Sequence, residues 1–304
     1  MKFVVKFFSC TLFLILICFC TACSLFTKPA SPSLKAKPAP TPASLPEVEV
    51  EHEGTILDTE EYLVKLLGAD PDNIFGYNLE VSFQNKTASK EVRFTLVAAS
   101  INGVQSLVSL PTWVEPGQTL KDPWDLENLE KFGIPNTEYS HIELLLEISD
   151  ATTDNVKPLW LGKVHIYPQG KNKASHFTYQ VQESDRILMD NDLVTVLYTG
   201  ADVDDASDMF LAHLVLINKT DNPISLVFSD YTLNGRSELL GAYQTLWPKN
   251  TDFMDFNWTI ANGKGYDLKD LSDVKKVQFT IEVRWGEYTQ KGETVATEKI
   301  NLIP

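Results

Sequence analysis

Residues 77–96 read YNLEVSFQNKTASKEVRFTL, and this stretch decides the fold class. Apolar and polar side chains alternate over 77–83 and again over 92–96. A period of two residues is typical of a strand with one buried face. Asn85-Lys86-Thr87 interrupts the alternation, so the stretch predicts two strands joined as a hairpin.

The same landmarks return later in the chain. Asn85-Lys86-Thr87 recurs as Asn218-Lys219-Thr220, and Asn102-Gly103 recurs as Asn234-Gly235. Both Asn-Gly pairs predict tight turns, because these residues tolerate a positive φ. Further matches in the same order are Gly68-Ala69-Asp70 with Gly200-Ala201-Asp202, Pro116 with Pro248, Thr119 with Thr251, Trp124 with Trp258, Glu147 with Glu282, and 163–168 with 299–304. The ordered series indicates a duplication.

Each half of the duplication carries several short alternating segments, including Ile142–Ile148 and Val277–Trp285. About seven short strands in a segment of this size predict an antiparallel β-sandwich of the immunoglobulin type. The fold class is therefore all-β, with two tandem Ig-like domains. The predicted boundaries are a signal peptide at 1–22, a lipidated start and Pro-rich tether at 23–46, domain 1 at 47–168, a linker at 169–184, and domain 2 at 185–304.

The beginning of the chain has the proportions of a secretory signal. Lys2 and Lys6 precede a largely apolar run over 7–19, which is shorter than the ~20 residues that span a bilayer. All four cysteines lie within this region, at Cys10, Cys18, Cys20 and Cys23. The chain after Cys23 therefore has neither a disulfide framework nor a thiol nucleophile.

Charge separates the tether from the body. Segment 27–46 holds six prolines, three lysines and no acid, a composition that favours extended polyproline II. Every acidic residue lies at or beyond Glu47, so the net charge of −15 becomes 21 − 41 = −20 for residues 47–304. Such a body is not expected to bind nucleic acid.

Thr21-Ala22-Cys23 resembles the lipobox of bacterial lipoproteins, in which two small residues precede a cysteine that receives diacylglycerol. Cys20 departs from the pattern, since leucine is usual there. The resemblance implies that Cys23 is lipidated and becomes the mature N-terminus. Two acyl chains give stable anchoring, so we expect the chain on the extracytoplasmic face of the cell membrane.

The order of landmarks in both halves resembles Ig-like domains of lipoproteins from low-GC Gram-positive bacteria. In these domains an apolar strand ends in Asn, then Lys or Asn, then Ser or Thr. An Asn-Gly turn follows, then a bend that contains Pro or Gly, and then a strand that ends in an apolar run containing Glu. The bend reads Pro116-Gly117 in the first half and Pro248-Lys249 in the second, a mild departure. The resemblance implies a fold and a location, and carries over no catalytic residue.

The sequence holds no familiar catalytic or cofactor motif. Five histidines stand singly, at His52, His141, His165, His176 and His213. None forms the His-x-x-x-His spacing that places two ligands on one helix face. We therefore expect no enzyme, no cofactor and no histidine metal site.

Three other features suggest binding surfaces. The acidic cluster Asp202, Asp204, Asp205 and Asp208 is a candidate calcium loop, although it lacks the EF-hand pattern and a solvated loop is the plainer interpretation. Trp113, Trp124, Trp247 and Trp258 suit either a core or a sugar platform. In the second half, Leu211, Val215 and Ile217 stand where the first half has a polar strand face, and we expect them to contact the first domain, linker residues such as Phe177 and Tyr179, a partner protein, or their own domain.

These observations predict a membrane-anchored surface lipoprotein that acts as a non-catalytic binding, adhesion or envelope-scaffold module. Its expected partners are the lipid membrane, through Cys23, and a protein or cell-wall component. One alternative is the solute-binding component of a transporter, a class that needs parallel sheets alternating with long helices. Another is an accessory subunit of an envelope enzyme, which would need a concave site with converging polar groups.

Overall fold

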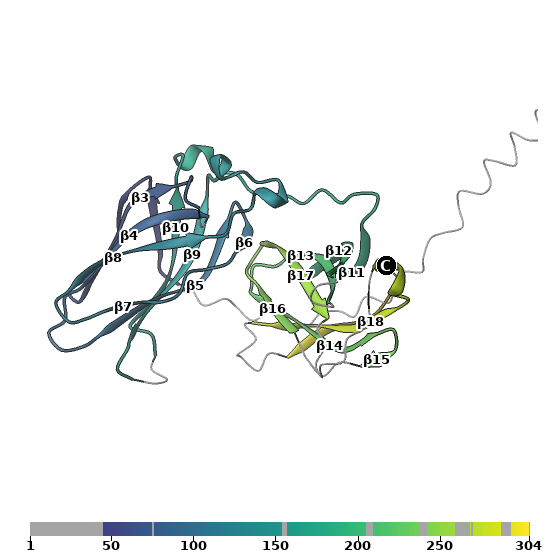
Figure 1. Ribbon diagram of the computed structural model, residues 1–304. Coiled ribbons are helices and arrows are strands. Elements are labelled where there is room, and N and C mark those ends of the chain that lie inside the picture. The colour runs from purple at the N-terminus through teal and green to yellow at the C-terminus, as the bar shows by residue number, and fades with distance from the viewer. Residues whose placement is uncertain are drawn as a thin grey trace, which may run out of the picture. The chain divides into compact units, whose positions relative to one another are not determined.

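The computed structural model describes residues 45–74, 76–153, 157–204, 209–237, 242–258, 268, 270–286 and 293–303 (Figure 1). Within these ranges the chain forms strands and short 3₁₀ helices, and no α-helix. The predicted all-β class is confirmed. None of the described helices has the length and apolar character needed to cross a membrane.

Two facing sheets are built from the strands before residue 168. One sheet has the order β2-β3-β4-β8, and the other runs β1-β10-β9-β5 with β6 and β7 paired to β5. The strands are β1 (Glu47–Glu51), β2 (Gly54–Asp58), β3 (Tyr62–Asp70), β4 (Tyr77–Asn85), β5 (Val92–Ile101), β6 (Val104–Ser106), β7 (Thr112–Val114), β8 (Thr119–Leu126), β9 (Ile142–Asp150) and β10 (Trp160–Tyr167). Their pairs are antiparallel except β1 with β10. The 3₁₀ turns here are η1 (Glu130–Phe132), η2 (Asn136–Glu138) and η3 (Lys171–Lys173).

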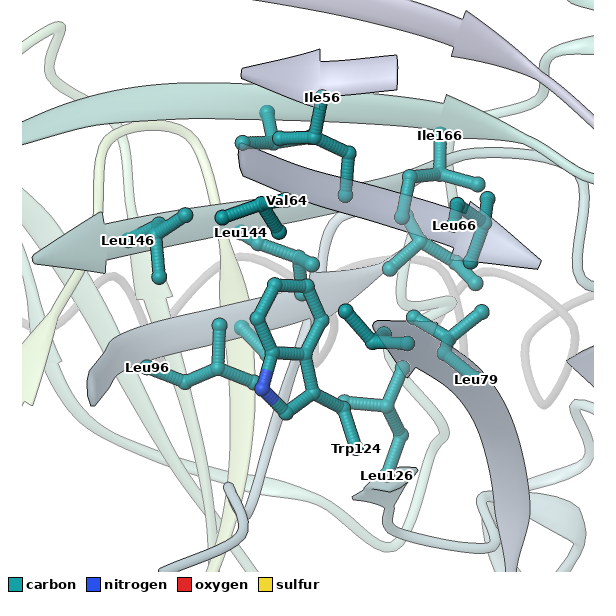
Figure 2. Packing of buried hydrophobic residues seen from close by; sticks show 14 of the residues in the cluster. Ile56, Val64, Leu66, Leu79, Leu96, Trp124, Leu126, Leu144, Leu146 and Ile166 are labelled. Atoms are coloured by element: carbon teal, nitrogen blue, oxygen red, sulfur yellow. The ribbon is translucent and has the colours of Figure 1, made fainter. Parts of the chain in front are cut away.

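The space between these two sheets is filled by one hydrophobic cluster. Figure 2 shows the Trp124 indole pointing from β8 toward Leu96 of β5 and Leu144 of β9. The ring of Phe83 lies 4.9 Å from that of Phe94 and 5.4 Å from that of Trp124, measured between centroids. Large aromatic side chains from both sheets therefore meet in the core of a β-sandwich.

The later strands repeat this arrangement around a second hydrophobic cluster. One sheet has the order β11-β12-β13-β17, and the other has β19-β18-β14 with β15 and β16 paired to β14. The elements are β11 (Arg186–Asp190), β12 (Val194–Asp204), β13 (Met209–Asn218), β14 (Ile224–Leu233), β15 (Arg236–Ser237), β16 (Ala242–Leu246), β17 (Thr251–Trp258), η4 (Leu271–Asp273), β18 (Val277–Trp285) and β19 (Thr294–Leu302). The order matches β2-β3-β4-β8 and β10-β9-β5 of the earlier strands, as the duplicated landmarks require.

The predicted hairpin at Asn85-Lys86-Thr87 is wrong. Strand β4 pairs with β3 and β8, whereas β5 lies in the opposite sheet, so the chain crosses between layers here. The buried Asn85 amide lies at the crossing, where it donates to the carbonyls of Lys90 and Val114 and accepts from Thr87. Alternation shows which residues face a core, but does not show which sheet a strand joins.

All the described residues, from 45 to 303, belong to one compact unit. Strands β6 and β17 are paired in parallel where Val104 faces Thr251, so sheets from the two halves are continuous at this point. The Thr251 amide donates to the Gly103 carbonyl at 2.8 Å. The division into two domains with a linker at 169–184 stays a prediction.

Candidate functional site

The structure describes only part of the predicted site residues. Cys23 lies outside the described residues, as do Asp205 and Asp208, and nothing is described of the Asp204 side chain. Asp202 is exposed on β12, and its carboxylate lies 3.0 Å from Nε2 of His213. The described part of the acidic cluster therefore contains a carboxylate paired with histidine.

The apolar positions on β13 lie on the face opposite the second hydrophobic cluster. Val215 is 2% exposed, whereas Leu211 and Ile217 are half-buried. The alternating residues Phe210, Ala212, Leu214 and Leu216 belong to the cluster. Val215 is paired with Leu197 of β12 and Phe253 of β17, so an apolar row crosses three strands on this outer face.

Phe253 connects that row to the first half of the chain. Its ring stacks on Phe132 with centroids 4.0 Å apart and planes 9° apart. Phe177 and Tyr179 of the predicted linker approach the same ring, at 6.0 and 6.1 Å between centroids. Phe253, which belongs to the second half of the chain, thus packs against the hydrophobic cluster of the first half.

Polar contacts accompany this aromatic group. The Gln105 amide donates to the Thr245 carbonyl at 3.0 Å and accepts from the Trp247 amide at 2.7 Å. It also lies 3.4 Å from the carboxylate of Asp252, which is buried. Burial raises the pKa of Asp252 to about 7, against the opposing effect of a hydrogen bond from Gln244.

The tryptophan positions do not share one environment. Trp124 is buried in the first core, as the core interpretation predicts. Trp113 is 50% exposed on β7, so the core interpretation is wrong for this residue. Trp247 is half-buried, and nothing is described of the Trp258 side chain. These tryptophans therefore do not form one platform in the described residues.

Two histidines that stand apart in the sequence are neighbours in space. Glu143 of β9 lies directly opposite His165 of β10, and His141 lies two residues before Glu143 on the same face. Nε2 of His141 lies 3.0 Å from Nδ1 of His165, and that nitrogen lies 3.6 Å from Oε2 of Glu143. His141, Glu143 and His165 offer ligand atoms within 4.8 Å of one another, and we call them the histidine triad.

Neighbouring side chains hold the histidine triad in place. The Tyr167 ring stacks on His141, with centroids 5.0 Å apart and planes 11° apart. Lys163 lies 3.8 Å from Glu143 on the same sheet. Burial lowers the pKa of His141, and the charge of nearby His165 lowers it further, so the neutral imidazole is favoured.

The five histidines stand singly along the sequence, and the fold brings His141 and His165 together. The sequence separates them by 24 residues, and no spacing rule joins positions so distant. The local signal was His141-x-Glu143, which places both side chains on one face of a strand. Only the register of β9 against β10 brings His165 to them.

A separate pocket of about 500 Å³ opens near the start of β4 and the end of β10, with Tyr77, Tyr139 and Asn136 among its lining residues. The Asn136 side-chain nitrogen donates to the Pro71 carbonyl, while its oxygen is buried without a hydrogen-bond partner.

No protein-family model and no curated protein matches this chain. Among solved structures, it resembles one described as a β-galactosidase from Bacteroides fragilis at 12% identity and a TM-score of 0.21, covering 74% of this chain and 32% of that one. The chain thus spans about a third of that structure's length. The collagen adhesin of S. aureus is similar at 9% identity and a TM-score of 0.20, covering 83% of this chain and 88% of that one. An anti-sigma factor domain-containing protein gives 9% identity and a TM-score of 0.15, covering 72% and 82%.

Proposed function

We propose that this protein is a lipoprotein anchored through Cys23 to the extracytoplasmic face of the cell membrane, where its tandem Ig-like domains act as a non-catalytic binding, adhesion or scaffold module. The observation that carries the proposal is the position of the cysteines. All four lie in the first 23 residues, beside a signal-like apolar run, and the β-rich body has none. This distribution suits an exported chain that uses a cysteine for attachment to lipid and not for disulfides.

The architecture supports a binding role over transport. Solute-binding components alternate parallel strands with long helices, whereas the described residues form antiparallel sheets apart from the pairs β1–β10 and β6–β17. The alternative, an accessory subunit of an envelope enzyme, needs a concave site, and the pocket beside Tyr77 and Tyr139 is the candidate for it. Its test is whether a purified envelope enzyme retains this chain.

Lipidation is tested by growing cells that express the chain with an alkyne analogue of palmitate. The wild-type chain and Cys20→Ser should incorporate the label, and Cys23→Ser should not, because only Cys23 occupies the modified position. Equal labelling of Cys23→Ser, or no labelling of the wild type, would overturn the anchor.

The partner is sought by cross-linking on intact cells, followed by mass-spectrometric identification of the neighbours. A binding module should give a recurrent protein or cell-wall neighbour whose cross-links map to residues 47–304. Cross-links confined to the first 46 residues would contradict a binding role for the body.

A further inference from the structure

The histidine triad has the composition and the placement of a transition-metal site. It combines two imidazoles and one carboxylate from adjacent strands of one sheet, all on the same face. All three side chains are half-buried, so they are partly shielded from water and still accessible to an ion. This arrangement goes beyond the proposed function and does not depend on lipid anchoring.

The distances fit a small tetrahedral ion. Zinc binds imidazole nitrogen and carboxylate oxygen at about 2.0–2.2 Å, so neighbouring ligand atoms around a tetrahedral zinc lie about 3.3–3.6 Å apart. The separations here are 3.0 Å between His141 and His165 and 3.6 Å between His165 and Glu143. The ligand atoms of all three side chains lie within 4.8 Å of one another, which is near the spacing that one ion requires.

We propose that His141, Glu143 and His165 bind one Zn²⁺ ion, with a fourth coordination position left open to water or to a group from a partner. Imidazole nitrogen suits zinc and related transition metals. Calcium prefers six to eight oxygen ligands, and this site supplies one carboxylate. The stacked ring of Tyr167 fixes the His141 imidazole in its orientation.

One neighbouring charge competes with the ion. The partly exposed Lys163 ammonium group lies 3.8 Å from Oε1 of Glu143, while Oε2 faces His165, so its positive charge opposes a cation bound beside it. The more distant ammonium of Lys171 is held by the Glu49 carboxylate at 2.6 Å. We therefore expect Lys163→Met to bind zinc more tightly than the wild type.

The test is zinc titration calorimetry on the full chain, purified in detergent and stripped with EDTA. Any free cysteine thiol is first alkylated with iodoacetamide, because thiolates also bind zinc. The compared proteins are the wild type, His165→Ala, Glu143→Gln and the control His213→Ala. His213 is a suitable control because its two nitrogens point to different carboxylates, those of Asp255 and Asp202. One metal ion therefore cannot bind His213 together with both carboxylates.

We expect one zinc ion per chain in the wild type and in His213→Ala. His165→Ala should weaken binding at least about 100-fold and Glu143→Gln at least about 10-fold, since loss of a ligand exceeds the effect of losing an outer-shell partner. Cobalt substituted in the wild type should give the visible spectrum of a tetrahedral ion. Absence of wild-type binding, or equal binding by His165→Ala, would overturn the proposal. If His165→Ala fails to fold by circular dichroism, Glu143→Gln decides the question.

Discussion

At the scale of single residues, two buried asparagines, one in each half, make equivalent hydrogen bonds to backbone carbonyls. Asn218 donates to the carbonyls of Asn222, Leu246 and Trp247 and accepts from Thr220, much as Asn85 does with its own neighbours. The lysine that follows each asparagine reaches an aspartate of an earlier strand end or turn: Lys86 reaches Asp58, and Lys219 reaches Asp190. The repeated Asn-Lys-Thr thus fixes the place where the chain changes sheets.

We expect Asn85→Ala to lower the free energy of unfolding by about 2–4 kcal/mol, because it removes several buried hydrogen bonds, including those donated to the Lys90 and Val114 carbonyls. Lys86→Ala is the matched control, and its partly exposed ion pair should contribute less than about 1 kcal/mol. Urea unfolding of both variants measures the difference. Equal losses in the two variants would contradict the role assigned to the asparagine.

At the scale of elements, the two Asn-Gly hairpins can be compared directly. Asn102 and Gly103 have φ values of 50° and 80°, and Asn234 and Gly235 have 50° and 81°. Both turns therefore adopt the left-handed conformation that the sequence predicts. Their surroundings differ, since a Cβ atom on Gly103 would come within 2.1 Å of the His176 ring, whereas one on Gly235 would meet no described atom within 4 Å.

Gly235→Ala should cost about 1 kcal/mol of unfolding free energy, from backbone strain alone. Gly103→Ala should cost more, because it also displaces His176 from the β5–β6 turn. The double variant Gly103→Ala/His176→Ala should return to the cost of Gly235→Ala. Thermal melts of the three variants check this cycle, and a double variant no more stable than Gly103→Ala would refute the predicted clash.

The sequence predicted where strands form, but it did not predict which strands pair or in which register. The period-two pattern of 77–83 and 142–148 correctly indicated strands, because alternation directly reflects one buried face. The meeting of Glu143 with His165 depends on the register of β9 and β10, which sequence spacing does not encode. For the same reason the sequence identified the apolar residue Val215 but not its pairing with Phe253.

At the scale of the whole molecule, the junction between the two halves combines an aromatic stack with a buried acid. The ring of Phe253 stacks on that of Phe132. The preceding residue, Asp252, places its carboxyl group beside Gln105. The sequence around Asp252 carries no sign of this burial, because an aspartate in an alternating strand is ordinarily solvated. Asp252 is buried beside the place where β6 pairs with β17.

This buried acid makes the stability of the molecule depend on pH. The pKa of Asp252 is raised to about 7 in the folded chain, and an aspartate in the unfolded chain titrates near 4. Between these values the folded state holds a proton that the unfolded state releases. The contribution of Asp252 to stability therefore falls as pH rises from about 4 to about 7.

Asp252→Asn removes this titration while keeping the size of the side chain. Relative to the wild type, the variant should gain little at pH 4 and up to about 4 kcal/mol of unfolding free energy at pH 8. Asp221→Asn is the control, since Asp221 is exposed and its pairing with Lys249 is a surface contact. Urea unfolding across this pH range measures both differences. A gain for Asp252→Asn that does not grow with pH would show that the carboxyl group ionises in the folded junction as freely as in the unfolded chain, and the junction would then have to admit water or a cation beside Gln105.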